Sequence, residues 1–333
     1  MSLKEIFGQT RIVLIFVLLV SILFLSGCIG EKTPKQKKTY TIGILWMNPS
    51  TDAVKGFKDG MREFGYVEGK NVIYLYRNAM GDEEKARIHA TELVAKNVDL
   101  LFVGSTPCTL IAKDATKGTD IPVLFTVVSD PVGSGIVQGI ESSGNNLAGI
   151  SSITEGSKRL ELLFDILPNT KRLGVIYNPN DKSPQKTVAQ FREVLENTNI
   201  ELTEAYIQSP EEVEGAVRSL IGRVDVIMVP PDSMVMANPG PIIKASYEHG
   251  IPLGMPNRRG VEAGGLFAIS SDHYELGKRV AKMADRVLKG TKPRDLPLEF
   301  PYNYIISINL KTAEKLNITI PQSVLKRADY IVE

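Results

Sequence analysis

One stretch, residues 98–109 (VDLLFVGSTPCT), constrains the fold of this chain more than any other. Its first half is an almost continuous apolar run, as expected for a parallel strand that helices cover on both faces. The run ends abruptly at Gly104–Pro107, and a helical pattern begins at Cys108. In open parallel sheets, ligands bind at the carboxyl ends of the strands, where the next helix offers unpaired backbone N–H groups. The stretch therefore predicts an α/β fold with a ligand site beside this turn.

A second copy of the pattern occurs at residues 224–233 (VDVIMVPPDS). Each copy follows a similar first strand and precedes a strand that Ile-Pro opens. Every α/β protein repeats βα units, but here the same dipeptides recur in the same order. A chain of 333 residues is long enough for two domains. We therefore expect two similar Rossmann-like lobes with parallel sheets and a cleft between them. The flanking strands are predicted at residues 41–47, 119–130, 172–178 and 249–257.

The amino terminus has the pattern of a secretory signal. Lys4 and Arg11 are basic and accompany an apolar run, residues 12–25, that is too short for a typical membrane-spanning helix. The run ends at residues 25–28 (LSGC), where small residues occupy the expected cleavage position. Residues 28–39 are polar, rich in lysine and without periodicity, so we expect them to form a flexible tether.

Charge and motifs exclude several classes of function. The 39 Lys and Arg residues balance 38 Asp and Glu residues, which gives no sign of a nucleic-acid partner. His89, His249 and His273 lie far apart in the sequence, and no Cys/His cluster suggests a metal. Ser271 and Asp272 directly precede His273, and neighbouring residues rarely point together as a catalytic triad. There is also no P-loop and no G-x-S-x-G motif. We therefore expect a chain that is not an enzyme and that needs neither metal nor cofactor.

Seven segments in order make the chain resemble the solute-binding lipoproteins of ABC importers with the type I periplasmic-binding-protein fold. More narrowly, it is similar to the branch that includes tryptophan and phenylalanine binders. The resemblance runs over about residues 40–320. The segments are IGIL (42–45), GFKDGMREFGYVEGKN (56–71), STPCTLIAKDAT (105–116), IPVLFTVVSDPVGSGIV (121–137), GVIYN (174–178), VDVIMVPPDSMV (224–235) and SDHYELGKR (271–279).

This resemblance implies a Venus-flytrap, in which two lobes are joined by a three-crossing hinge and close on a small ligand. The crossings are expected near residues 149–154, 267–271 and 296–302. The implied N-terminal lobe comprises residues 40–150 plus 270–297, and the C-terminal lobe comprises residues 151–269 plus 298–333.

The residues around Cys28 resemble the lipobox of prokaryotic lipoproteins. This implies that residues 1–27 are a lipoprotein signal peptide and that a lipidated Cys28 holds the protein on the outer face of the cell membrane. The alternatives are a plain membrane anchor and a signal without lipidation. With Cys28 modified, Cys108 is the one thiol left, and no intramolecular disulfide is expected.

The resemblance also implies the partners. It suggests a monomer that captures a small solute, an amino acid or similar zwitterion, and delivers it to an ABC permease and its ATPase. Two alternatives stay open: a flytrap that reports its ligand to a membrane kinase or chemoreceptor, and a surface-anchored enzyme.

Five candidate ligand contacts lie in the first lobe. Ser105 and Thr106 begin a helix and suit a ligand carboxylate, or they serve only as a helix cap. Ser129 and Asp130 end the neighbouring strand, where Asp130 either takes a ligand ammonium group or caps a helix. Trp46 either stacks on an aromatic or apolar ligand or belongs to the core.

Four further candidates lie in the second lobe and at the hinge. Asn178 ends the first strand of that lobe and is expected to face the cleft. Asp232 is the counterpart of Ser105 and Thr106 and suits a ligand ammonium group. Asp272, at the second crossing, either binds ligand or braces the hinge. Asn257 lies in the loop after the second Ile-Pro strand.

That loop, residues 255–259 (MPNRR), departs from the related branch, where it is usually small and acidic or hydroxylic. Arg258 and Arg259 suit a carboxylate or a phosphate, or they are plain surface charge. Because of this departure, the resemblance alone does not make an aromatic amino acid the ligand of this chain. The sequence does not decide whether Arg258 and Arg259 touch the ligand.

Overall fold

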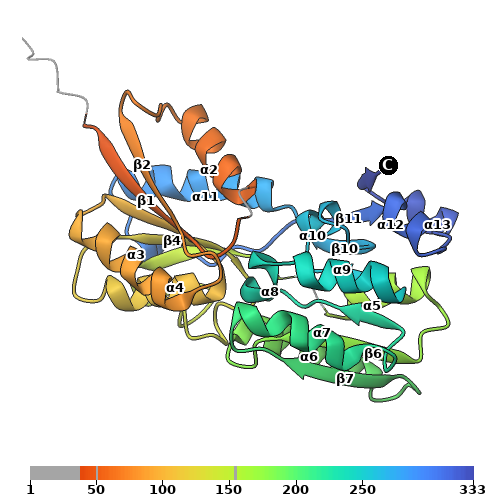
Figure 1. Cartoon of the computed structure of the whole chain (residues 1–333). Helices are drawn as coiled ribbons and strands as arrows, with labels where there is room; N and C mark the ends of the chain where they lie inside the picture. The colour runs from red at the N-terminus through yellow and green to blue at the C-terminus, as the bar shows by residue number, and fades with distance from the viewer. Residues whose placement is uncertain (1–37, 50–51, 154–155) are drawn as a thin grey trace, which may run out of the picture. The chain divides into compact units, whose positions relative to one another are not determined.

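The computed structural model describes residues 38–49, 52–153 and 156–333. Cys28, the expected signal peptide and nearly all of the expected tether lie outside the described residues. From Thr39 onward the chain forms one compact unit that contains two sheets (Figure 1). No helix in the described ranges is long and apolar enough to cross a membrane.

The first sheet is parallel, with the strand order β2-β1-β3-β4-β5. Every residue of β3 and β5 is buried, because helices cover both faces, as the apolar runs predict. One apolar cluster packs α2 against the sheet, and a second packs α3 and α4 against the opposite face. The elements are β1 (Tyr40–Trp46), α2 (Asp52–Glu63), β2 (Val72–Asn78), α3 (Glu83–Ala95), β3 (Leu100–Gly104), α4 (Thr106–Ala115), β4 (Val123–Val128) and β5 (Leu147–Ser151).

The second sheet has the strand order β12-β11-β10-β9-β8-β6-β7. Its run β7-β6-β8-β9-β10 repeats the order of the first sheet, so the duplicated sequence pattern corresponds to a duplicated topology. The pair β10 and β11 is antiparallel, whereas its other pairs are parallel. The strands are β6 (Arg172–Tyr177), β7 (Glu201–Tyr206), β8 (Val226–Met228), β9 (Leu253–Met255), β10 (Phe267–Ser271), β11 (Tyr304–Asn309) and β12 (Tyr330–Val332).

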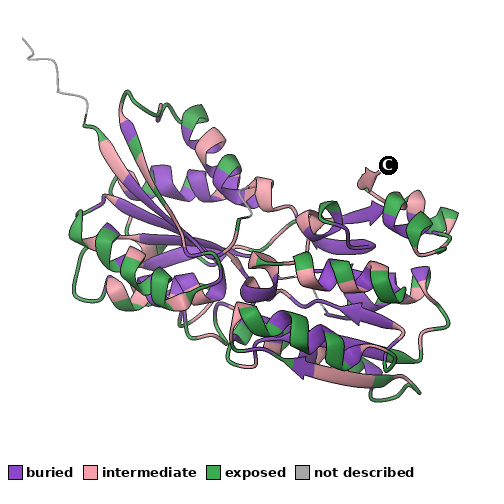
Figure 2. Cartoon of the chain, in the orientation of Figure 1, coloured by how far each residue is buried: buried purple, intermediate pink, exposed green. Residues whose placement is uncertain are grey.

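Amphipathic helices cover this second sheet, with their buried residues toward it and their exposed residues outward (Figure 2). They are α5 (Gly156–Ile166), α6 (Lys182–Leu195), α7 (Val213–Leu220), α8 (Ser233–Ala237), α9 (Gly240–His249), α10 (Arg258–Glu262), α12 (Leu310–Lys315) and α13 (Gln322–Leu325).

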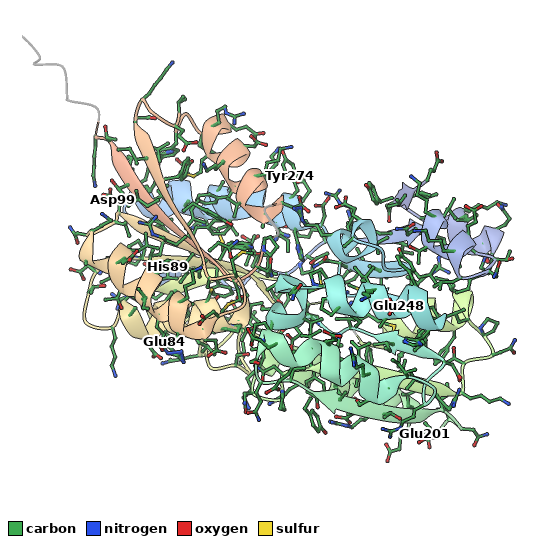
Figure 3. The ribbon with its side chains drawn as sticks, in the orientation of Figure 1. Glu84, His89, Asp99, Glu201, Glu248 and Tyr274 are labelled. Atoms are coloured by element: carbon green, nitrogen blue, oxygen red, sulfur yellow. The ribbon has the colours of Figure 1, made fainter. Side chains whose placement is uncertain are left out.

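Helix α11 (His273–Leu288) follows a strand of the second sheet but packs in the first lobe, against α2 (Figure 1). Two glycines allow the close approach of the helices. A Cβ atom added to Gly56 would lie 2.0 Å from the carbonyl oxygen of Tyr274, and one added to Gly277 would lie 2.0 Å from that of Ala53. Tyr274, labelled in Figure 3, also donates its hydroxyl to Asp59 of α2 at 3.1 Å. Helix α11 is therefore held in the N-terminal lobe.

The chain returns from α11 along the edge of the first sheet before it enters β11. Leu298 donates its backbone N–H to the carbonyl oxygen of Ile140 at 2.7 Å, and Glu299 donates to that of Gly149 at 3.1 Å. Strand pairing thus assigns Leu298 and Glu299 to the first lobe. It also assigns residues 270–271 to the second sheet.

Candidate functional site

A cavity lies between the two lobes, where the carboxyl ends of strands from both sheets meet. Its volume is about 40 Å³, room for a few water molecules, so the two lobes lie close together here. Four of the residues predicted from the sequence line it: Thr106 and Ser129 from the first lobe, and Asp232 and Asn257 from the second.

The wall from the first lobe contains two residues with unusual backbone geometry. Ser105 has φ of 86° and Val127 has φ of 59°, both in the left-handed region that side chains with a Cβ rarely adopt. Such strain persists only where the surrounding structure enforces it, and it clusters at binding and catalytic sites. Val127 itself lines the cavity, at an irregularity in the pairing of β4 with β5. The strained backbone therefore lies at the predicted strand ends.

Ser105 and Thr106 have different roles at the start of α4. Ser105 caps the helix, because its hydroxyl accepts the backbone N–H of Cys108 at 3.4 Å. The Oγ1 atom of Thr106 is buried, and it has no hydrogen-bond partner among the described residues. Thr106 lines the cavity, and since buried hydroxyl groups nearly always have a partner, its Oγ1 is an unused hydrogen-bonding group at this wall.

Asp232 is engaged by the backbone of its own lobe although it lines the cavity. One carboxylate oxygen accepts the N–H groups of Met234 and Val235, and the other accepts the N–H of Asn178 at 2.6 Å. The side chain is 1% exposed, and burial raises its pKa. Asn178 contributes this N–H, while its side chain accepts from the backbone of Asn180. Asp232 therefore ties the end of β6 to the start of α8.

Three contacts hold the lobes together around the cavity. The Ser183 hydroxyl donates to the Ser129 hydroxyl at 2.9 Å. The ammonium group of Lys186 lies 3.6 Å from the carboxylate of Asp130. The third contact joins Arg258 of α10 to Asp52 of α2, described next.

Arg258 reaches across the cleft from the loop that departs from the related branch. Its guanidinium donates to Asp52 at 3.3 Å and also lies 3.4 Å from Glu262. Asp52, Arg258 and Arg259 line a small neighbouring cavity rather than the main one. Arg258 is therefore a link between the lobes at the rim of the site.

The other candidates from the sequence do not line the main cavity. Trp46 is 3% exposed and packs in the core, with its ring 5.4 Å from that of Phe102, so the core interpretation accounts for it. Asp272 caps α11 through the N–H groups of Tyr274 and Glu275. Asp130 accepts the N–H of Gly133 in addition to its contact with Lys186.

Sequence reasoning missed Arg159, which lines the main cavity from α5. Its side chain is 3% exposed, and burial lowers its pKa to about 10, so it stays protonated at neutral pH. One signal in the sequence could have revealed it: Arg159, Leu163 and Ile166 share the buried face of an amphipathic helix, where a charged residue is rare. His273 also lines the cavity, and burial lowers the pKa of its imidazole.

These groups can bind the anionic and the cationic group of a zwitterion. The cavity holds one buried cation, one buried carboxylate and several hydroxyl groups. Across the described ranges, no cluster of three or more His, Cys, Asp and Glu side chains could hold a metal ion.

Comparisons with known proteins agree with this arrangement. A family model described as ABC transporter substrate binding protein matches residues 44–332. The chain is 33% identical over 291 residues to a tyrosine-binding protein of Clostridioides difficile (strain R20291), covering 86% of this chain and 84% of that one.

Two solved structures bear on the placement of the lobes. The ABC domain from Streptococcus pneumonia in complex with L-Trp is 29% identical, with a TM-score of 0.83 over 89% of this chain and 100% of that chain. The ligand-free, open structure of a substrate binding protein with adhesive properties from Clostridium difficile is also 29% identical. Its TM-score is 0.64 over 88% of this chain and 99% of that chain. At equal identity, this chain superposes better on the ligand complex than on the open structure. The chain belongs to the ABC transporter substrate binding protein family and has the type I periplasmic-binding-protein fold.

Proposed function

We propose that this chain is the extracytoplasmic solute-binding component of an ABC importer and that it binds an amino acid between its lobes. The observation that carries the proposal is the pair of opposite buried charges, Arg159 and Asp232, in one interlobe cavity. An amino acid supplies a carboxylate for the first and an ammonium group for the second. Thr106, Ser129 and Asn257 add hydrogen-bonding groups around the ligand.

Two relatives support an amino acid as the ligand class. The similar protein of Clostridioides difficile is a tyrosine-binding protein, and the similar domain from Streptococcus pneumonia was solved with L-Trp. Tyrosine and tryptophan are therefore the first ligands to test.

Ligand capture in this proposal is coupled to closure. Contacts from both lobes favour the closed state, and a permease reads that state. The links Ser183 to Ser129, Lys186 to Asp130, and Arg258 to Asp52 form across the same cleft and add to the closed state.

The anchor completes the proposal. A lipidated Cys28 would hold the monomeric protein at the outer face of the cell membrane, with the following residues as a tether. Two or more lipid chains give stable anchoring, since each buried CH₂ contributes about 0.8 kcal/mol.

A binding screen tests the function. Residues 39–333 would be heated with each of the twenty amino acids, and binding would be measured by calorimetry. A ligand at a hundred times its Kd adds about 2.7 kcal/mol to stability, a shift that melting curves resolve readily. Small-angle scattering should show a smaller radius of gyration with the ligand. The proposal fails if no amino acid stabilises the protein.

A further inference from the structure

We infer that Arg159 binds the carboxylate of the ligand, and that Thr106 of the opposite lobe donates a second hydrogen bond to the same group. The inference rests on the proposed function and deepens it. It makes the carboxylate, shared by all amino acids, the part of the ligand that closes the lobes.

The first support is the unmet hydrogen bonding of Arg159. A guanidinium has five N–H donors. Here Nη1 and Nη2 both donate to one carbonyl oxygen, that of Pro256, at a long 3.3 Å each. Nε is buried and has no partner, and no carboxylate among the described residues forms an ion pair with Arg159.

Two surface arginines of the same lobe provide a contrast. Arg172 pairs with Asp225 at 2.7 Å, and Arg327 pairs with Asp165 at 2.7 Å, although both arginines are partly exposed to water. Arg159 is buried, yet no carboxylate in the part of the chain that the structure describes pairs with it. Burying an unpaired charge costs several kcal/mol, and a carboxylate matches the planar fork of a guanidinium.

The second support comes from the other lobe. Thr106 begins α4 and lines the same cavity as Arg159, and its buried Oγ1 has no partner among the described residues. The amino terminus of a helix also favours negative charge. A carboxylate has about four acceptor sites on two oxygens, so one group can satisfy both side chains. Because these side chains belong to different lobes, a shared carboxylate joins the lobes directly.

The other charged groups described near Arg159 do not supply the anion that its guanidinium lacks. His273 is buried, and its neighbours Asp52 and Asp272 are engaged elsewhere: the first contacts Arg258, and the second caps α11. Asp232 accepts three backbone N–H groups, and because a carboxylate has about four acceptor sites, one site remains for an ammonium group at the other end of the ligand.

The test compares each amino acid with the amine that lacks its carboxylate. L-tyrosine is paired with tyramine, L-tryptophan with tryptamine, and any tighter-binding amino acid with its own amine. Calorimetry on residues 39–333 should show that the amine binds roughly 100-fold more weakly, a loss of about 2.7 kcal/mol, because it leaves a buried charge without its partner.

Variants assign the effect to the two side chains. Arg159→Gln should weaken amino-acid binding about 100-fold while leaving the weak binding of the amine unchanged. Thr106→Val keeps the shape of the side chain and should weaken amino-acid binding about tenfold. The substitution should not lower the melting temperature of the free protein, because the hydroxyl that it removes is buried and has no partner. Arg327→Gln, which breaks a surface pair, is the matched control and should bind like the wild type.

The outcomes separate the two proposals. If the wild type binds no amino acid, both fall. If it binds one, and Arg159→Gln or the amine binds equally well, the function stands and this inference falls. If Arg159→Gln does not fold, Arg159→Lys keeps the charge without the fork and should still lose about tenfold, and unchanged affinity there overturns the inference.

Discussion

Replacing Asp232 with alanine should destabilise the protein by about 2–4 kcal/mol. The change removes the side-chain cap of α8, for which caps of this type contribute about 0.5–2 kcal/mol. It also leaves the buried N–H of Asn178 without an acceptor, at a cost of about 1–3 kcal/mol. Asp232→Asn keeps an oxygen for Met234 and Val235 but turns an amide N–H₂ toward Asn178, so it should lose about half as much.

Thermal unfolding followed by circular dichroism measures the effect. For a unit of this size, a loss of 2–4 kcal/mol lowers the melting temperature by roughly 4–8 °C. The matched control is Asp82→Ala, which removes an exposed cap with a single acceptor bond, to Lys85, and should cost about 1 kcal/mol or less. Equal melting temperatures for the Asp232→Ala and Asp82→Ala proteins would refute the reasoning.

Three further changes test other parts of the structure. Burial, and then repulsion from a nearby carboxylate, raise the pKa of Asp181 well above its ordinary value. The folded protein therefore binds this proton more tightly than the unfolded chain, and the stability it contributes is lost as the pH rises through the raised pKa. Asp181→Asn should raise the melting temperature at neutral pH, with the gain vanishing toward acidic pH; a pH-independent difference would contradict this. Arg258→Ala removes the link to Asp52 and should shift the ligand-free protein toward an open form, which scattering would detect as a larger radius. Gly277→Ala places a methyl group against the backbone of Ala53 and should cost several kcal/mol, whereas a wild-type melting temperature would show that α2 and α11 separate easily.

The fold was largely predictable because it is encoded locally and twice. The repeated Val-Asp and Ile-Pro strands predict two similar lobes, and the two sheets share one strand order. The docking of α11 on α2 shows why exact lobe boundaries are harder. It depends on Gly56 facing Tyr274 and Gly277 facing Ala53, contacts between residues more than two hundred positions apart that no local pattern reveals.

The site was predictable in position but not in detail. Thr106 and Ser129 line the cavity because polar residues at the ends of parallel strands meet at one edge. From the sequence, Ser105 could be either a helix cap or a ligand contact. In the structure its hydroxyl accepts the N–H of Cys108, a contact that depends on three-dimensional geometry. Arg159 was missed because it lies within a helix, whereas the sequence pattern places candidate ligand contacts at the ends of strands.

The crossing of α2 and α11 also determines how the chain can be divided. The core of the N-terminal lobe includes α11 and Leu298, which come after most of the second lobe in the sequence. A fragment ending at residue 153 would therefore bare the apolar face of α2, with Phe57 and Met61, to water. Such a surface promotes aggregation, so no single cut yields a stable first lobe. During synthesis the first lobe can therefore complete its core only after residues near 299 have been made.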